Sequence, residues 1–145
     1  MKKVVTFGEV MVRLAPSEHY RFAQSCPGSI DLTFGGAESS VAASISMLGG
    51  SSRFVSALPQ HAIADAFVRQ MRGFKVDVDH VLRREAGRFG IYYVETGANQ
   101  RPSRVIYDRD YSAVSICSGE EYDWDAIFAD AQWLHISGIT LAISE

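Results

Sequence analysis

Two adjacent glycines, Gly35 and Gly36, form the clearest local candidate for a binding site in this sequence. They lie between a short extended run at 30–34 and a helical pattern that begins at Ala37. Glycine lets a ligand approach the backbone closely, and N–H groups beside a helix N-terminus bind hydroxyl or carboxylate oxygens. The same residues could instead form a tight turn whose small side chains let a helix pack on a sheet. From these residues alone, both interpretations stand.

A second candidate is a pair of strand-like runs rich in tyrosine. Period-two geometry places Tyr107 and Arg109 on one face of the second run, and Tyr92 shares a face with Val94 on the first. Arginine binds carboxylates in a bidentate manner, and phenols donate to hydroxyls. This surface therefore suits a small polyhydroxy acid. The alternative is an amphipathic hairpin with ordinary tyrosines and a solvated arginine.

Motifs of other common sites are absent from the sequence. The chain contains no G-x-x-x-x-G-K-[ST] loop, no G-x-G-x-x-G after its first strand, no G-x-S-x-G and no H-E-x-x-H. Its acidic pairs fall in turns and at a helix start, so we interpret them as solvated carboxylates and predict no metal site. Two cysteines far apart in sequence are interpreted as reduced thiols. The four scattered histidines are interpreted as surface or structural residues: His19, His61, His80 and His135.

The composition is that of an ordinary globular chain of one domain or part of one. Of 145 residues, 47% are hydrophobic and 21% charged, which excludes a disordered or fibrous protein. The net charge of −3 and the lack of a basic block argue against nucleic-acid binding. Apolar runs are too short to span a membrane, and the first one is too short for a signal peptide. We therefore expect a cytoplasmic protein.

The hydrophobic pattern predicts the elements that position these residues. Strand and helix patterns alternate in the first half of the chain, which is typical of a parallel sheet with crossover helices. The two tyrosine-rich runs then form a hairpin around a loop at 96–103. The predicted strands are 4–7, 11–14, 30–34, 53–57, 76–81 (half-buried or an extended edge), 90–95, 104–109 and 133–139. The predicted helices are about 37–48, 62–72 and a short one capped by Asp123.

The run at 133–139 has the pattern of a central strand of a sheet, yet only six residues follow it in this sequence. A parallel sheet needs helices over both faces. We therefore expect the domain to continue beyond Glu145.

Three segments, in this order and spacing, resemble the N-terminal part of the ribokinase/PfkB family of carbohydrate kinases. They are the run at 4–16, the Gly-Gly-Ala-Glu turn at 35–38 and the Trp-Leu-His-Ile-Ser-Gly-Ile-Thr run at 133–140. The likeness covers essentially all 145 residues and is greatest to the 2-keto-3-deoxygluconate kinase branch. It implies part of a three-layer α/β/α sandwich with a small antiparallel β lid at 11–14, 30–34 and 90–109.

The resemblance also implies a function, which is ATP-dependent phosphorylation of a sugar or sugar acid. Matched by position, the substrate-binding residues would be Gly35, Gly36, Tyr92, Tyr107 and Arg109. Met11 and Ser40 are further candidates, although the family usually has asparagine at the place of Ser40. The family's Gly-Ala-Gly-Asp run, which carries the catalytic aspartate, is absent, so we assign no catalytic residue to this chain.

The expected partners follow from the same resemblance. ATP and Mg²⁺ would act in the complete enzyme, and neither is expected to bind tightly to this chain alone. The small-molecule partner would be a sugar or sugar acid, with no nucleic acid or membrane involved, and the lid could mediate a homo-oligomer. The alternative is a non-catalytic sugar-binding or dimerisation module that pairs with another chain through Ile91, Tyr93 or Ile106.

Overall fold

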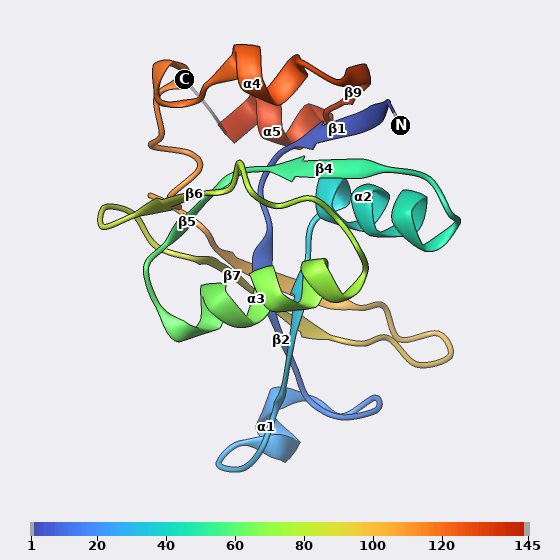
Figure 1. Cartoon of the computed structure of the whole chain (residues 1–145). Helices are drawn as coiled ribbons and strands as arrows, with labels where there is room; N and C mark the ends of the chain where they lie inside the picture. The colour runs from blue at the N-terminus through green and yellow to red at the C-terminus, as the bar shows by residue number, and fades with distance from the viewer. Residues whose placement is uncertain (1, 144–145) are drawn as a thin grey trace.

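The computed structural model describes residues 2–143 and shows a mixed α/β fold with a core sheet and a second sheet that projects from it (Figure 1). The strands are β1 (Lys3–Phe7), β2 (Met11–Ala15), β3 (Asp31–Gly35), β4 (Ser52–Val55), β5 (Ala57–Pro59), β6 (Leu82–Arg84), β7 (Gly90–Glu95), β8 (Arg104–Asp108) and β9 (Ala131–His135). The helices are α1 (Phe22–Ser25), α2 (Ala37–Met47), α3 (Ala62–Gly73), the short 3₁₀ turn Gly119–Glu121, α4 (Trp124–Phe128) and α5 (Gly138–Ile143).

The core sheet is parallel, with strand order β4-β1-β9, and helices cover both of its faces. Successive side chains of a strand point to opposite faces, so Phe54 and Val55 of β4 enter different hydrophobic clusters. Phe54 packs in one cluster with Ala42 of α2, and Val55 packs in the other with Ile127 of α4. Figure 1 shows α2 and α4 on opposite sides of β4 and β1. The predicted three-layer α/β/α arrangement is confirmed.

The second sheet, called the lid sheet below, has the order β3-β2-β7-β8. Its two hairpins are antiparallel and correspond to the predicted lid segments. The prediction of an antiparallel lid was wrong for the central pair, since β2 and β7 run parallel. Strands β2 and β7 both begin at the core and run outward from it, although they are far apart in the sequence. Two neighbouring strands that both begin at the core end of the sheet must be parallel.

Helix α3 shows how local sequence and packing agree. The His61 side chain caps its N-terminus by accepting a hydrogen bond from the Ala64 N–H at 3.3 Å, a structural role of the kind expected for the histidines. Ala64, Phe67 and Met71 are buried along one face of the helix. Their side chains pack against both sheets and fix the lid sheet to the core. None of the helices within residues 2–143 is long and apolar enough to cross a membrane.

Besides the run 53–57, which is split between β4 of the core sheet and β5, two predicted strands differ from the structure. The segment 76–81 forms one bridge, between Asp77 and Arg53, and the strand β6 comes only after it. The predicted strand 133–139 ends at His135 as β9, and α5 begins at Gly138. Among residues 2–143, β9 pairs with β1 on one side and has no strand neighbour on the other, and Trp133 is 69% exposed. A short apolar run does not distinguish a strand from the start of a helix, which explains the second error.

An ion-pair cluster joins the core strands at the end where β1 begins. The Arg53 side chain, 7% exposed, donates from Nε to Asp77 Oδ2 and from Nη1 to Asp130 Oδ1, both at 2.8 Å. Lys3 Nζ lies 2.9 Å from the same Asp77 oxygen. Burial raises the pKa of Asp77, but the hydrogen bonds from Lys3, the Asp79 N–H and Arg53 outweigh it and lower the pKa to about 2.

This cluster predicts loss of stability in acid. Because the folded pKa of Asp77 lies below the ordinary value of 3.8, its contribution is complete above pH 4 and is lost as the pH falls towards 2. We expect the free energy of unfolding to fall by about 2 kcal/mol from this group over that interval. Urea unfolding at pH 6, 4, 3 and 2.5 measures it, with Asp77→Asn as the comparison. Equal stability at all four pH values would contradict the prediction.

Candidate functional site

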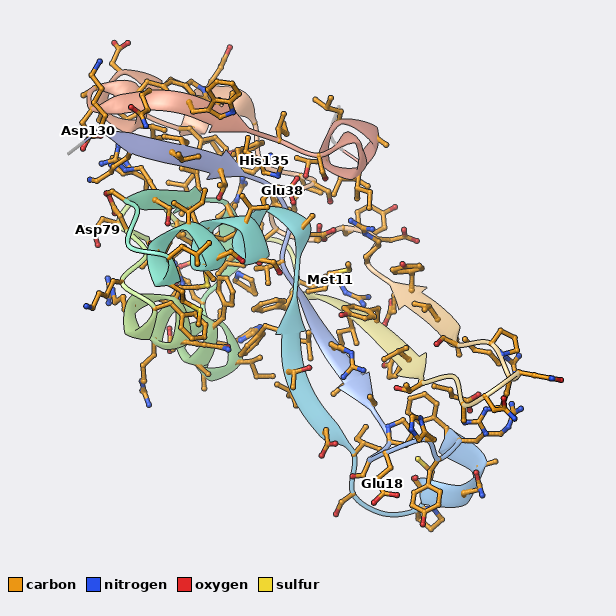
Figure 2. The ribbon with its side chains drawn as sticks, turned by 90° about the vertical axis from the view of Figure 1, so that its right-hand side faces the viewer. Met11, Glu18, Glu38, Asp79, Asp130 and His135 are labelled. Carbon is orange, nitrogen blue, oxygen red and sulfur yellow. The ribbon has the colours of Figure 1, made fainter. Side chains whose placement is uncertain are left out.

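The lid sheet places two rows of residues side by side on one face. Reading across β3, β2 and β7, the inner row, nearer the core, contains Gly35, Met11 and Gly90, and Arg109 follows β8 beside Gly90. The outer row contains Thr33, Arg13, Tyr92 and Tyr107, which are register partners across all four strands. Figure 2 shows Met11 where the lid sheet meets the core. Residues from four separate strands thus form one continuous surface.

The tyrosines and the first glycine of the pair are in direct contact. A Cβ added to Gly35 would collide with the Tyr92 hydroxyl, so this phenol occupies the space that the absent side chain leaves. The Tyr107 ring lies beside Tyr92 with centroids 6.1 Å apart, and the Arg109 guanidinium carbon lies 5.8 Å from the Tyr107 centroid. The structure therefore brings together four of the predicted site residues, Gly35, Tyr92, Tyr107 and Arg109.

The remaining predicted residues lie around this group. A Cβ on Gly36, the N-cap of α2, would meet the backbone of Glu9 and Val10, so the second glycine allows close packing of α2 against the segment that joins β1 to β2. Met11 is partly buried beside Gly90. Ser40 is exposed one turn into α2, and its backbone N–H donates to the Gly36 carbonyl at 3.0 Å.

Arg109 has an ionic partner that sequence reasoning missed. Its Nη2 donates to Glu9 Oε2, and the side chains of Arg109 and Glu9 are only 18% and 3% exposed. Arg109 Nε and Glu9 Oε1 are buried without another hydrogen-bond partner among the described residues. The pair joins the segment between β1 and β2 to the end of β8. Glu9 is the one charged residue in the mostly apolar run at 4–12, and this pattern could have predicted that its carboxylate is buried and needs a partner.

Glu38 is a second buried carboxylate missed at the sequence level. Its Oε1 accepts from the Ser137 N–H at 2.9 Å and from Thr140 Oγ1 at 2.7 Å. Its carboxylate lies against Gly8, where any Cβ would collide with it. Burial raises the pKa of Glu38, yet the hydrogen bonds from Thr140 and Ser137 prevail and hold it below the ordinary value. Glu38 therefore stays ionised and ties the start of α2 to the start of α5 (Figure 2).

Arg13 is the third missed residue, and its position follows from strand periodicity. It lies two residues beyond Met11 on the same face of β2 and is the register partner of Tyr92. Burial raises the pKa of the Tyr92 hydroxyl, and the nearby charge of Arg13 partly opposes that rise. The face thus carries two guanidinium groups beside two phenols. Within residues 2–143, no three His, Cys, Asp or Glu side chains gather as they would around a metal ion.

Comparison with known proteins shows the family of the chain. The model of the pfkB family of carbohydrate kinases matches residues 1–145. The chain belongs to the pfkB family. Among curated relatives, it is 38% identical over 143 residues to the 2-dehydro-3-deoxygalactonokinase of Haloferax volcanii, covering 99% of this chain and 44% of that protein. It is 29% identical over 140 residues to the 2-dehydro-3-deoxygluconokinase of Bacillus subtilis, covering 97% and 42%.

Solved structures of pfkB relatives share the fold over the whole chain. The crystal structure of the 2-dehydro-3-deoxygluconokinase of Thermotoga maritima matches with a TM-score of 0.94 and 45% identity, covering 100% of this chain and 44% of that one. A putative 2-keto-3-deoxygluconate kinase from Enterococcus faecalis matches with a TM-score of 0.91 and 27% identity, covering 100% and 42%. The chain therefore spans somewhat less than half the length of the relatives that it matches.

Proposed function

We propose that this chain provides the substrate-binding half of a kinase that phosphorylates a sugar acid of the 2-keto-3-deoxygluconate type with ATP. The observation that carries the proposal is the contact of the Tyr92 hydroxyl with Gly35, with Tyr107 and Arg109 next to it on the same face. Phenols, backbone N–H groups and guanidinium donors are the groups that bind hydroxyls and a carboxylate. Family membership and the names of the relatives support the same substrate class.

In this proposal each residue has a distinct task. The backbone at Gly35 and Gly36 binds sugar hydroxyls at close range, because no side chain blocks the approach. Tyr92 and Tyr107 donate to further oxygens, and Arg109 binds through the donors that Glu9 leaves free. Met11, which lies between Gly35 and Gly90 in the inner row, forms an apolar floor, and Ser40 offers its hydroxyl from α2. These groups hold the sugar in one orientation, which is the main contribution a protein makes to phosphoryl transfer.

ATP and Mg²⁺ are assigned to the complete enzyme. When bound, they supply the phosphoryl group and stabilise its charge during transfer. The described residues offer no cluster of acidic ligands for the metal, and the 145 residues lack the Gly-Ala-Gly-Asp run in which the resemblance places the catalytic base. We therefore propose that this chain binds sugar and does not turn it over by itself. We expect the enzyme to act in the cytoplasm, where ATP is available.

A second candidate function is association through the lid sheet. On the face opposite the two rows, Ile106 is 60% exposed and its neighbour on the same face, Leu32, is 47% exposed. The other two residues expected there are not exposed, because Ile91 packs against the core and Tyr93 packs on Phe22. Exposed apolar side chains on a sheet are typical of a protein interface. Under this alternative, the chain is a non-catalytic dimerisation module. A monomeric mass in solution at micromolar concentration would count against it.

Calorimetric titration of the 145-residue chain with 2-keto-3-deoxygluconate tests the first proposal. Gly35→Ala is expected to weaken binding by on the order of tenfold, because the new Cβ displaces the Tyr92 hydroxyl from its place. Gly73→Ala is the matched control, since a Cβ there meets nothing within 4 Å, and it should leave the affinity unchanged.

Two results would overturn the proposal. One is that the unmodified chain does not bind the sugar acid. The other is rapid ADP release by the chain alone when it is mixed with ATP, Mg²⁺ and the sugar acid, because the proposed base is not part of it.

A further inference from the structure

The outer row of the lid sheet contains a positive charge that no acidic group within residues 2–143 balances. Arg13 is partly buried between Thr33 and Tyr92, its register partners on the two neighbouring strands. Among the described residues, its guanidinium takes part in none of the salt bridges or side-chain hydrogen bonds. A half-buried guanidinium without a partner is unfavourable in the empty protein and is satisfied by an anion.

The other guanidinium on this face differs in its charge balance. Arg109 and Glu9 form a buried ion pair, so together they contribute no net charge. Asp31 is the acidic residue that shares this face on β3. It lies one row further out, is exposed and accepts from the Ser17 hydroxyl. The net positive charge next to the two phenols therefore comes from Arg13.

We infer that Arg13 supplies the unbalanced positive charge that binds the carboxylate of the sugar acid and selects an anionic sugar over a neutral one. This inference rests on the proposed function and assigns the acid-binding role to a residue that the sequence comparison did not single out. It also orients the ligand. The two rows are two residues apart along each strand, roughly 6–7 Å. A six-carbon acid can therefore place its carboxylate at the outer row and its hydroxyls at Gly35 in the inner row.

The test compares two ligands that differ only at the acidic end. The unmodified chain and Arg13→Gln are titrated with 2-keto-3-deoxygluconate and with 3-deoxyfructose, which has a hydroxymethyl group in place of the carboxylate. Arg13→Gln should weaken binding of the acid by on the order of 10- to 100-fold and change binding of the neutral sugar by less than about threefold. Arg13→Lys keeps the charge and should recover part of the affinity for the acid.

Arg104→Gln is the matched control, because it removes the same charge from the opposite face of the lid sheet. It should leave both affinities unchanged, and circular dichroism of each variant checks that the fold is kept. An unchanged affinity of Arg13→Gln for the acid, or an equal loss for both ligands, would overturn the assignment to Arg13 while leaving the proposed function intact. If the unmodified chain binds neither ligand, the proposed function fails and this inference fails with it.

Discussion

Arg109→Ala is expected to lower the free energy of unfolding by about 3–5 kcal/mol at neutral pH. The substitution leaves the Glu9 carboxylate, 3% exposed, without its ionic partner, and an uncompensated buried charge carries a penalty of this size. The same substitution should weaken binding of the sugar acid by on the order of 2–4 kcal/mol, because charge-assisted donors are lost at the site. Denaturant unfolding and calorimetry measure the two effects separately.

Two further variants test whether the stability loss of Arg109→Ala comes from the burial of its ion pair. Arg88→Ala removes an arginine from a nearby pair with Asp108, whose side chains are 42% and 48% exposed, and should change stability by less than about 1 kcal/mol. Glu9→Gln combined with Arg109→Gln removes both charges and should be more stable than Arg109→Ala. If Arg109→Ala and Arg88→Ala have the same free energy of unfolding, the Arg109–Glu9 pair does not contribute the stability expected of a buried ion pair.

Phe67→Ala should produce a loss of similar size, about 3–5 kcal/mol, for a different reason. The Phe67 ring is 2% exposed and makes edge contacts with Phe34 and Phe54 at centroid distances of 5.4 and 5.7 Å. Truncation leaves a cavity between the core sheet and the lid sheet, which cannot collapse without moving one sheet against the other. Thermal and urea unfolding give the loss.

The control for Phe67→Ala lies on the same helix. Ile63 is 42% exposed, and Ile63→Ala should reduce stability by less than about 1 kcal/mol. Because Phe67 links the two sheets, its truncation should also weaken sugar binding more than Ile63→Ala does. A stability loss for Phe67→Ala no larger than that for Ile63→Ala would show that the sheets are not joined through this ring.

Local patterns were sufficient to predict most of the fold. The glycines after residue 48 and the apolar spacing of Phe67 and Met71 gave α2 and α3 within a residue or two. The period of two in the hairpin gave the common face of Tyr92 and Tyr107, because the register is fixed once the loop is placed. These features depend on residues close together in the chain.

Contacts across long stretches of chain could not be predicted in this way. Glu9 and Arg109 are 100 residues apart, and no local pattern pairs them. The start of α5 depends on Glu38, which accepts hydrogen bonds from Ser137 and Thr140. Without that distant carboxylate, the apolar run at 133–139 has the pattern of a continuous strand. The parallel pairing of β2 with β7 is likewise decided by where both strands leave the core.

The edge position of β9 has a practical consequence for handling the 145-residue polypeptide. In the part of the chain that the structure describes, β9 pairs with β1 on one side, and its backbone groups on the other side are available to a strand from another molecule. Trp133 and Leu134 add exposed apolar surface there. Concentrated preparations should consequently aggregate by edge-to-edge pairing, and a lysine in place of Trp133 is the change most suited to keep the polypeptide dispersed.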